Sequence, residues 1–321
     1  MVANPQAKRQ KETPKNEGGQ NEGAACGERA TRVACLLPSA TEIMGALGLG
    51  GSIIATTHEC DLCPDAAGLA ALSPEPPRVT STAINPHAMG QAEIDDAVKR
   101  SAASGLSLYA VDQPALLAAM PDLVITQALC AVCAVDTAEV NAVCVDIAKQ
   151  LGSSCRVLSL QPTDLPSVAE SFETVASACG VPERGAALRL EFERQLQQVS
   201  AAVDSTAAVA TAGAEKPSVL LLEWLDPVFD AGHWVPGQIE AAGCRVARLG
   251  DARTKSTERN WAAVVAADPD CILVGCCGFD AERNRSDVLN LLAGDGPAAD
   301  AFRSLRAVSA HAIRATDLSG V

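Results

Sequence analysis

Residues 182–203, PERGAALRLEFERQLQQVSAAV, predict a single long amphipathic helix in the middle of the chain. Its apolar side chains recur at a 4-4-3-4 spacing, which gathers them into one stripe: Leu188, Phe192, Leu196, Val199 and Val203. At about 1.5 Å per residue the helix would reach roughly 33 Å, about the width of a small domain. The pattern fits equally well a stiff spine that joins two lobes and an ordinary packed helix.

Strand-like and helical runs alternate on both sides of this helix. Before it, strand-like runs at 32–37, 52–57, 107–111, 122–127 and 155–160 alternate with helical patterns at 39–48, 92–103, 114–120 and 137–151. After it, runs at 218–224, 244–249, 270–275 and 307–315 alternate with helical patterns at 236–243, 257–267 and 282–293. A βαβ succession is typical of a parallel, doubly wound sheet. We therefore predict an α/β fold with an N-terminal lobe over 30–163 and a C-terminal lobe over 217–321.

The remaining segments differ in composition from the two lobes. Residues 164–204 form a predicted helical linker that includes the long helix, and residues 205–216 are rich in Ala and Thr, which indicates a flexible linker. Residues 1–29 are polar and of low complexity, so we expect a disordered tail.

Composition excludes several classes of protein. The 321 residues are 48% hydrophobic and 20% charged, which suits a globular chain of two ordinary domains. The net charge of −14 opposes association with nucleic acid or an anionic membrane. No apolar stretch approaches the roughly 20 residues needed to span a bilayer. We expect no nucleic-acid partner and no membrane insertion.

The tail and the cysteines bear on the compartment. Residues 1–29 hold no apolar segment before a cleavage site, so they predict no signal peptide. The 13 cysteines are an odd number, and a chain of this length does not need disulfides to build a core. In a reducing compartment, paired cysteines more often bind metal or act in catalysis. The sequence as written therefore predicts a cytoplasmic protein.

Two short motifs carry thiol and imidazole groups to the ends of neighbouring strands. HECDLCP (58–64) follows the run at 52–57, and CAVC (130–133) follows the run at 122–127. Ligands bind at the carboxyl ends of strands in open parallel sheets, so these groups are expected to face one crevice. Thiolates and neutral imidazole suit zinc, copper(I) or iron, and the candidate metal ligands are His58, Cys60, Cys130 and Cys133, with Cys63 or Cys277 as substitutes.

A dithiol redox enzyme is a third reading of the same residues. Cys130 and Cys133 could form a redox pair if a following helix stabilises one thiolate. However, the chain contains no serine-nucleophile elbow, phosphate-binding glycine loop or dinucleotide fingerprint. We therefore expect a protein that binds rather than one that catalyses.

Several runs, in order from about residue 31 to the end, have a family likeness. They are LLPSATEI (36–43), THECD (57–61), QAEID (91–95), SLY (107–109), PDLVITQ (121–127), CAVCAV (130–135), GHWVP (232–236) and CGF (277–279). Together they resemble the periplasmic-binding-protein family for cobalamin and iron complexes, class III, and more narrowly its cobalamin-binding-protein-like branch. The resemblance implies two Rossmann-like lobes bridged by one long helix, with the ligand held between them.

The resemblance also implies a ligand and a set of contacts. The expected ligand is a metal-containing small molecule, a corrinoid such as cobalamin or an iron chelate, bound by a monomer that would serve an ABC transporter if exported. The residues expected to contact it are His58, Glu59, Trp224, His233, Trp234, Cys277 and Phe279. Family members continue past the strand expected at 307–315 into a final helix, so the C-terminal lobe is expected to be truncated. Direct binding of zinc or iron by the thiols stays open as the alternative.

Overall fold

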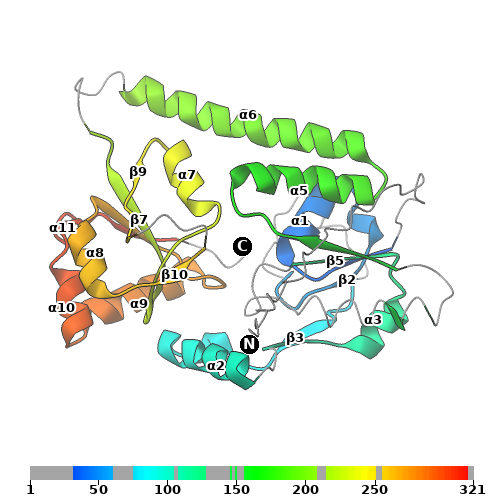
Figure 1. The fold of residues 1–321 in the computed structure, drawn as a ribbon, viewed down its shortest axis with the longest axis horizontal. Coiled ribbons are helices and arrows are strands. Elements are labelled where there is room, and N and C mark those ends of the chain that lie inside the picture. The colour runs from blue at the N-terminus through cyan, green and yellow to red at the C-terminus, as the bar shows by residue number, and fades with distance from the viewer. Residues whose placement is uncertain are drawn as a thin grey trace, which may run out of the picture.

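The molecule consists of two α/β lobes joined by one long helix, α6 (Pro182–Ala207) (Figure 1). The computed structural model describes residues 32–60, 75–104, 108–127, 145–146, 149, 155–207, 215–250 and 255–316. The predicted fold class, two α/β lobes bridged by a helix, is confirmed. The residue bounds of the domains stay a prediction.

The N-terminal lobe is built on a four-stranded parallel sheet. Its order is β2 (Ile53–Thr56), β1 (Val33–Cys35), β5 (Leu123–Gln127) and β6 (Arg156–Leu160). Along β1, Val33 and Cys35 face a cluster under α1 (Pro38–Ala46) and α5 (Leu165–Ala178), and Ala34 faces a cluster that includes Leu116 of α3 (Gln113–Ala119). Because both faces are covered, β1 is apolar and buried at every position, and β5 is buried from Leu123 to Thr126.

A two-stranded antiparallel ribbon extends this lobe. Strands β3 (Thr80–Thr82) and β4 (Tyr109–Val111) pair, and Arg78 just before β3 bridges to Thr56 of β2. The chain between β3 and β4 holds a 3-10 turn, η3 (Pro86–Ala88), and helix α2 (Gln91–Ser104). In Figure 1, α2 lies below the C-terminal lobe, and its Ile94 packs in the core cluster of that lobe.

The C-terminal lobe holds a mixed sheet. The order is β10 (Thr257–Glu258), β8 (Val228–Asp230), β7 (Ser218–Leu225), β11 (Cys271–Val274) and β12 (Ile313–Ala315), and β9 (Arg245–Val246) pairs with the start of β7. Strands β9, β11 and β12 extend the sheet in parallel, as predicted. Strands β8 and β10 are antiparallel, and this return was not predicted. Helices α8 (Trp261–Ala267), α9 (Ala281–Ala293) and α10 (Pro297–Arg303) lie on one face of the sheet, and α7 (Val235–Ala241) on the other.

Helix α6 contacts both lobes. Near its start, a Cβ on Gly185 would lie 2.5 Å from the Cβ of Ala176 in α5, so glycine allows the two helices to approach closely. Near its end, a Cβ on Gly243, just after α7, would overlap the side chain of Val203. The helix has 26 residues and is therefore about 39 Å long. Of the two readings of the apolar stripe, the spine is correct.

Of two further sequence expectations, one is untested and one is partly wrong. The helix expected at 137–151 lies outside the described residues except for 145–146 and 149. The strand expected at 307–315 is wrong up to residue 312, because α11 (Arg306–Ser309) precedes β12, which begins at Ile313. Among the described residues, no helix combines the length and the apolar composition needed to cross a membrane.

Candidate functional site

The imidazole of His58 is held at the carboxyl edge of the N-terminal sheet. Strand β2 ends at Thr56, and His58 follows after Thr57. Its Nδ1 lies 2.7 Å from the Oγ1 of Thr80 in β3, and its ring centroid lies 5.7 Å from that of Tyr109 in β4. The neighbouring ribbon therefore fixes the orientation of the ring.

Glu59 and Cys60 lie beside this imidazole. Oε1 of Glu59 lies 3.2 Å from Nε2 of His58, and the hydrogen bond with His58 lowers the pKa of the Glu59 carboxyl. Sγ of Cys60 lies 3.0 Å from Oγ1 of Thr41 in α1. The loop after β2 thus gathers an imidazole, a carboxylate and a thiol in three consecutive residues.

The structure describes two of the four proposed metal ligands, His58 and Cys60. Cys130 and Cys133 lie outside the described residues, so their distance to His58 and Cys60 stays untested. Among the residues that the structure does describe, no group of three or more His, Cys, Asp or Glu side chains is arranged to hold a metal ion. Direct metal binding by the thiols would therefore need a ligand outside the described residues, such as Cys63, Cys130 or Cys133.

Trp224 and Phe279 form an aromatic pair in the core of the C-terminal lobe. Their ring centroids lie 5.6 Å apart, and the guanidinium carbon of Arg283 lies 4.6 Å from the centroid of Phe279. Phe279 is only 2% exposed and packs in the core cluster that β7 and α9 share, and its expected contact with a ligand stays a prediction. Cys277, two residues earlier, is exposed.

His233 and Trp234 lie on the other face of the same sheet. They follow β8 and stand at the start of α7, with ring centroids 5.8 Å apart, and their neighbours Ala231 and Val235 pack against the face that α7 covers. Trp224 lies within β7 and pairs with Phe229 in a hairpin, so it does not share a loop with Trp234.

The loop that carries His233 is tightly fixed. A Cβ on Gly232 would overlap the backbone of Lys255 and Ser256, and the N–H of Gly232 donates to the Ser256 hydroxyl at 3.2 Å. Burial and the nearby charge of Lys255 lower the pKa of His233. A neutral imidazole is thereby favoured at this position.

A small cavity lies next to this loop. It has a volume of about 30 Å³ and is lined by residues of β7, β8 and α7 and of the chain that follows α7, among them Asp230, Val235 and Lys255. That is room for one or two waters and far less than a macrocyclic ligand needs. The cavity is not the binding site for a corrinoid.

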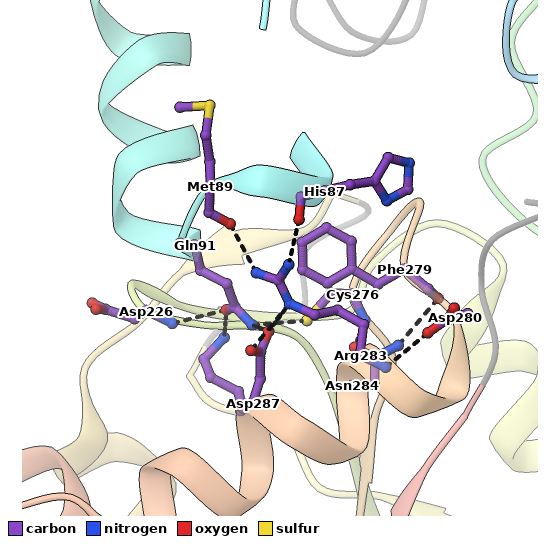
Figure 2. Close-up of polar contacts among 12 residues, drawn as sticks. His87, Met89, Gln91, Asp226, Cys276, Phe279, Asp280, Arg283, Asn284 and Asp287 are labelled. Carbon is purple, nitrogen blue, oxygen red and sulfur yellow. Dashed lines mark hydrogen bonds and ion pairs between the residues drawn. The ribbon is translucent and has the colours of Figure 1, made fainter. Parts of the chain in front are cut away.

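Gln91, at the start of α2, forms a polar junction between the two halves of the chain (Figure 2). Its carbonyl oxygen accepts hydrogen bonds from the backbone N–H groups of Leu225 at 2.6 Å and Asp226 at 3.2 Å. Its amide nitrogen donates to Oδ2 of Asp287 at 2.8 Å and to Sγ of Cys276 at 3.3 Å. Gln91 is 7% exposed, and all four contacts are with the C-terminal lobe.

Arg283 and Lys99 strengthen the same junction. Arg283 of α9 donates to the carbonyl oxygens of Met89 at 2.8 Å and His87 at 3.4 Å (Figure 2). Lys99 of α2 forms an ion pair with Glu258 of β10 at 3.1 Å. The segment between β3 and β4, which includes η3 and α2, is therefore docked on the C-terminal lobe. Sequence reasoning did not predict this docking. The sequence carries one signal, the apolar pair Ile94 and Val98 on one face of α2, and both residues pack in the core cluster of the C-terminal lobe.

Solved structures share this fold over most of the chain. A periplasmic vitamin B12-binding protein of Vibrio cholerae, BtuF, matches with a TM-score of 0.57 and 19% identity over 91% of this chain and 89% of that chain. A periplasmic heme-binding protein of Roseiflexus sp. RS-1, RhuT, matches with a TM-score of 0.56 and 20% identity over 90% and 89%. A third match is a Staphylococcus epidermidis protein that is described as a possible iron-binding (periplasmic solute-binding) protein. Its TM-score is 0.60, with 15% identity over 91% of both chains. No family model and no curated protein matches the chain.

These matches define the class of protein by its fold. The chain has the fold of periplasmic solute-binding proteins for iron, heme and vitamin B12, and the family resemblance seen in the sequence is confirmed at that level. The descriptions are of binding proteins rather than enzymes, in agreement with the expectation of binding.

The prediction of a cytoplasmic protein is wrong. Three solved proteins share this fold over about nine tenths of the chain, and all three are described as periplasmic. The prediction rested on the polar residues 1–29 and on a general rule about thiols. Neither of these bears on the packed lobes, which carry the likeness.

Proposed function

We propose that the protein binds a metal-containing small molecule between its two lobes, with a corrinoid such as cobalamin as the first candidate and a heme or another iron complex as the second. The observation that carries this proposal is the fold itself, since two lobes on one long helix match binding proteins for all three kinds of ligand. The specific choice of a corrinoid comes from the motifs at 57–61, 130–135 and 232–236.

Side chains on both lobes support the proposal. His58 and Glu59 follow β2 at the carboxyl edge of the N-terminal sheet. His233 and Trp234 follow β8, which is antiparallel to β7 and has Asp230 opposite Leu222. Imidazole and indole rings suit a large, flat, partly apolar metal complex, since they combine an apolar surface with a polar edge. Trp224 and Cys277 remain further candidates on this lobe.

Two properties of the working protein go with this function. We expect a monomer, since each chain holds both lobes, and a partner that receives the ligand, of the ABC-transporter kind. A solved ABC-transporter substrate-binding protein of Listeria monocytogenes has the same fold, with a TM-score of 0.55.

Equilibrium titration with separate ligands tests the proposal. We expect aquocobalamin or hemin to bind with one ligand per chain, and we expect Trp234→Ala to weaken that binding by at least about tenfold, as the loss of a buried aromatic contact does. His311→Asn is the matched control, because His311 is exposed, has a positive φ of 54° that Asn tolerates, and carries none of the proposed contacts. Failure of both ligands to bind the unmodified protein would overturn the proposal. Equal affinity in Trp234→Ala would remove Trp234 from the site.

A further inference from the structure

Gln91 lies in a crevice between the carboxyl ends of two neighbouring parallel strands of the C-terminal lobe. Its carbonyl oxygen accepts from the N–H of Leu225, the last residue of β7, and its amide nitrogen donates to Sγ of Cys276, two residues after β11. The connection that follows β7 runs over one face of the sheet through α7 to β9, whereas the connection that follows β11 runs over the other face through α9 and α10 to β12. The crevice is therefore a topological switch point, which is the place where open α/β sheets bind ligands.

The side chain that fills this crevice belongs to the other lobe. Strands β3 and β4 are paired in the ribbon of the N-terminal lobe, and just beyond the paired residues the N–H of Ala83 donates to the carbonyl oxygen of Leu108 at 2.8 Å. The segment 84–104 thus starts from the ribbon and reaches the C-terminal lobe (Figure 1). A residue of one lobe occupies the ligand crevice of the other.

Contacts on both sides of Gln91 hold this segment in place. Before Gln91, the guanidinium of Arg283 donates to two backbone carbonyl oxygens of the segment (Figure 2). After it, Ile94 is 5% exposed in the core of the C-terminal lobe, and Lys99 forms its ion pair with Glu258. The segment therefore crosses between the lobes with Gln91 near the middle of the contact.

The contact is of a kind that can open. The groups that bond to Gln91 and Arg283 are backbone N–H and C=O groups, a carboxylate and a thiol, and each can bond to water when the segment leaves. In the apolar part, Ile94 lies in the buried core and Val98 packs against it at partial burial. Interfaces between the domains of one chain permit relative movement unless they are large and hydrophobic.

We propose that residues 84–104 form a latch between the lobes. Gln91 in the switch-point crevice holds the lobes together, and the lobes separate for ligand exchange by undocking the latch from the C-terminal lobe. The existence of the latch is independent of any ligand, whereas its effect on ligand exchange rests on the proposed function. The two parts of the inference are tested separately.

A covalent bond across the latch provides the test. Nζ of Lys99 lies 3.1 Å from Oε2 of Glu258 and 2.7 Å from Oδ2 of Asp95. A carbodiimide can join the lysine to either carboxylate as an amide, and the carbodiimide takes up the released water and leaves as a urea. Asp95→Asn removes the link within α2 and keeps the link between the lobes. Asp95→Asn combined with Glu258→Gln can form neither link and is the matched control.

Amide hydrogen exchange tests the latch without a ligand. The N–H of Leu225 donates to Gln91, so undocking of the latch exposes it. In the control, this N–H should exchange faster than the slowest amides of β5, because a local opening costs less free energy than global unfolding. In the linked protein its exchange should fall to the rate of global unfolding, as measured at β5. Equal exchange of Leu225 in the linked protein and the control would overturn the latch.

Hemin binding kinetics test the effect on ligand exchange. Association and release of hemin should both be slower in the linked protein than in the control. Gln91→Ala, without a link, should speed both by about tenfold, because it removes the acceptor of a buried N–H from the docked state. Gln197→Ala, at an exposed glutamine of α6, should change neither rate.

The outcomes separate the latch from the proposed function. Hemin rates that are equal in the linked protein and the control, with Leu225 exchange slowed, would overturn the role of the latch in ligand exchange. If neither hemin nor aquocobalamin binds the unmodified protein, the proposed function fails, and the exchange of Leu225 still decides whether the latch exists.

Discussion

Replacement of Gln91 by alanine should weaken the junction between α2 and the C-terminal lobe. The substitution removes the acceptor of the Leu225 N–H, which is buried in a residue that is 4% exposed. A buried N–H left unsatisfied costs about 1–3 kcal/mol. Asp226 is exposed, so its N–H can donate to water instead and its loss adds little to the free-energy cost.

The amide nitrogen of Gln91 adds a second contribution. Its bond to Asp287 is a bond to a charged group, but Asp287 keeps its ion pair with Arg283 at 3.2 Å. We assign roughly 1 kcal/mol to this loss, so the total is about 3 kcal/mol. At roughly 2 °C per kcal/mol for a chain of this size, Tm should fall by about 6 °C.

Thermal unfolding and amide hydrogen exchange measure the two consequences. Gln91→Ala should lower Tm and should speed exchange in residues 91–104 more than in α9 or β7, because α2 is released from the opposite lobe. Gln238→Ala is the matched control, since Gln238 is an exposed glutamine in α7. If both variants change Tm by less than about 1 °C, or if exchange in α2 is unaltered, the junction does not hold the helix and the reasoning is refuted.

Two further predictions concern the spine contact and a buried carboxyl. In urea unfolding, Gly243→Ala should lose at least about 2 kcal/mol more stability than Gly278→Ala. Both residues have a φ of 77°, but only a Cβ at 243 would overlap Val203, so adding Val203→Ala should recover part of the loss. Equal losses in the two glycine variants would contradict the contact. Burial raises the pKa of the Glu223 carboxyl, so the folded state binds this proton more tightly and the native protein loses stability as the pH rises from about 4.3 through the raised value. The Tm of Glu223→Gln relative to the native protein should therefore increase with pH across that window and then level off, and a difference independent of pH would show that the carboxyl is not perturbed.

The parallel strands and the long helix could be predicted from the sequence because the spacing of apolar residues within each segment indicates which of its faces are buried. Strand β5 opens with three consecutive apolar residues, Leu123, Val124 and Ile125, as expected of a strand covered on both faces. The stripe on α6 marked a packed helix, but it did not say which elements the helix packs on. That required Val203 and Gly243, which are 40 residues apart in the chain, to meet in space.

The site was predicted less well because side-chain neighbours depend on the chain path. The Asp226-Pro227 turn reads as the start of a loop, whereas the chain returns as the three-residue strand β8 and so separates Trp224 from Trp234. Phe279 follows an exposed glycine-containing turn, yet its ring is buried against Trp224. The docking of α2 on the opposite lobe depends on Gln91, and a single glutamine carries no pattern that marks it as buried.

Elemental analysis with a visible spectrum, on protein purified without oxygen from cells supplied with cobalamin and heme, tests the central claim most directly. We predict cobalt or iron at one atom per chain, accompanied by the absorption bands of a corrin or a porphyrin. Stoichiometric zinc without cobalt or iron would contradict the account, because it would make the thiols and imidazole themselves the metal site.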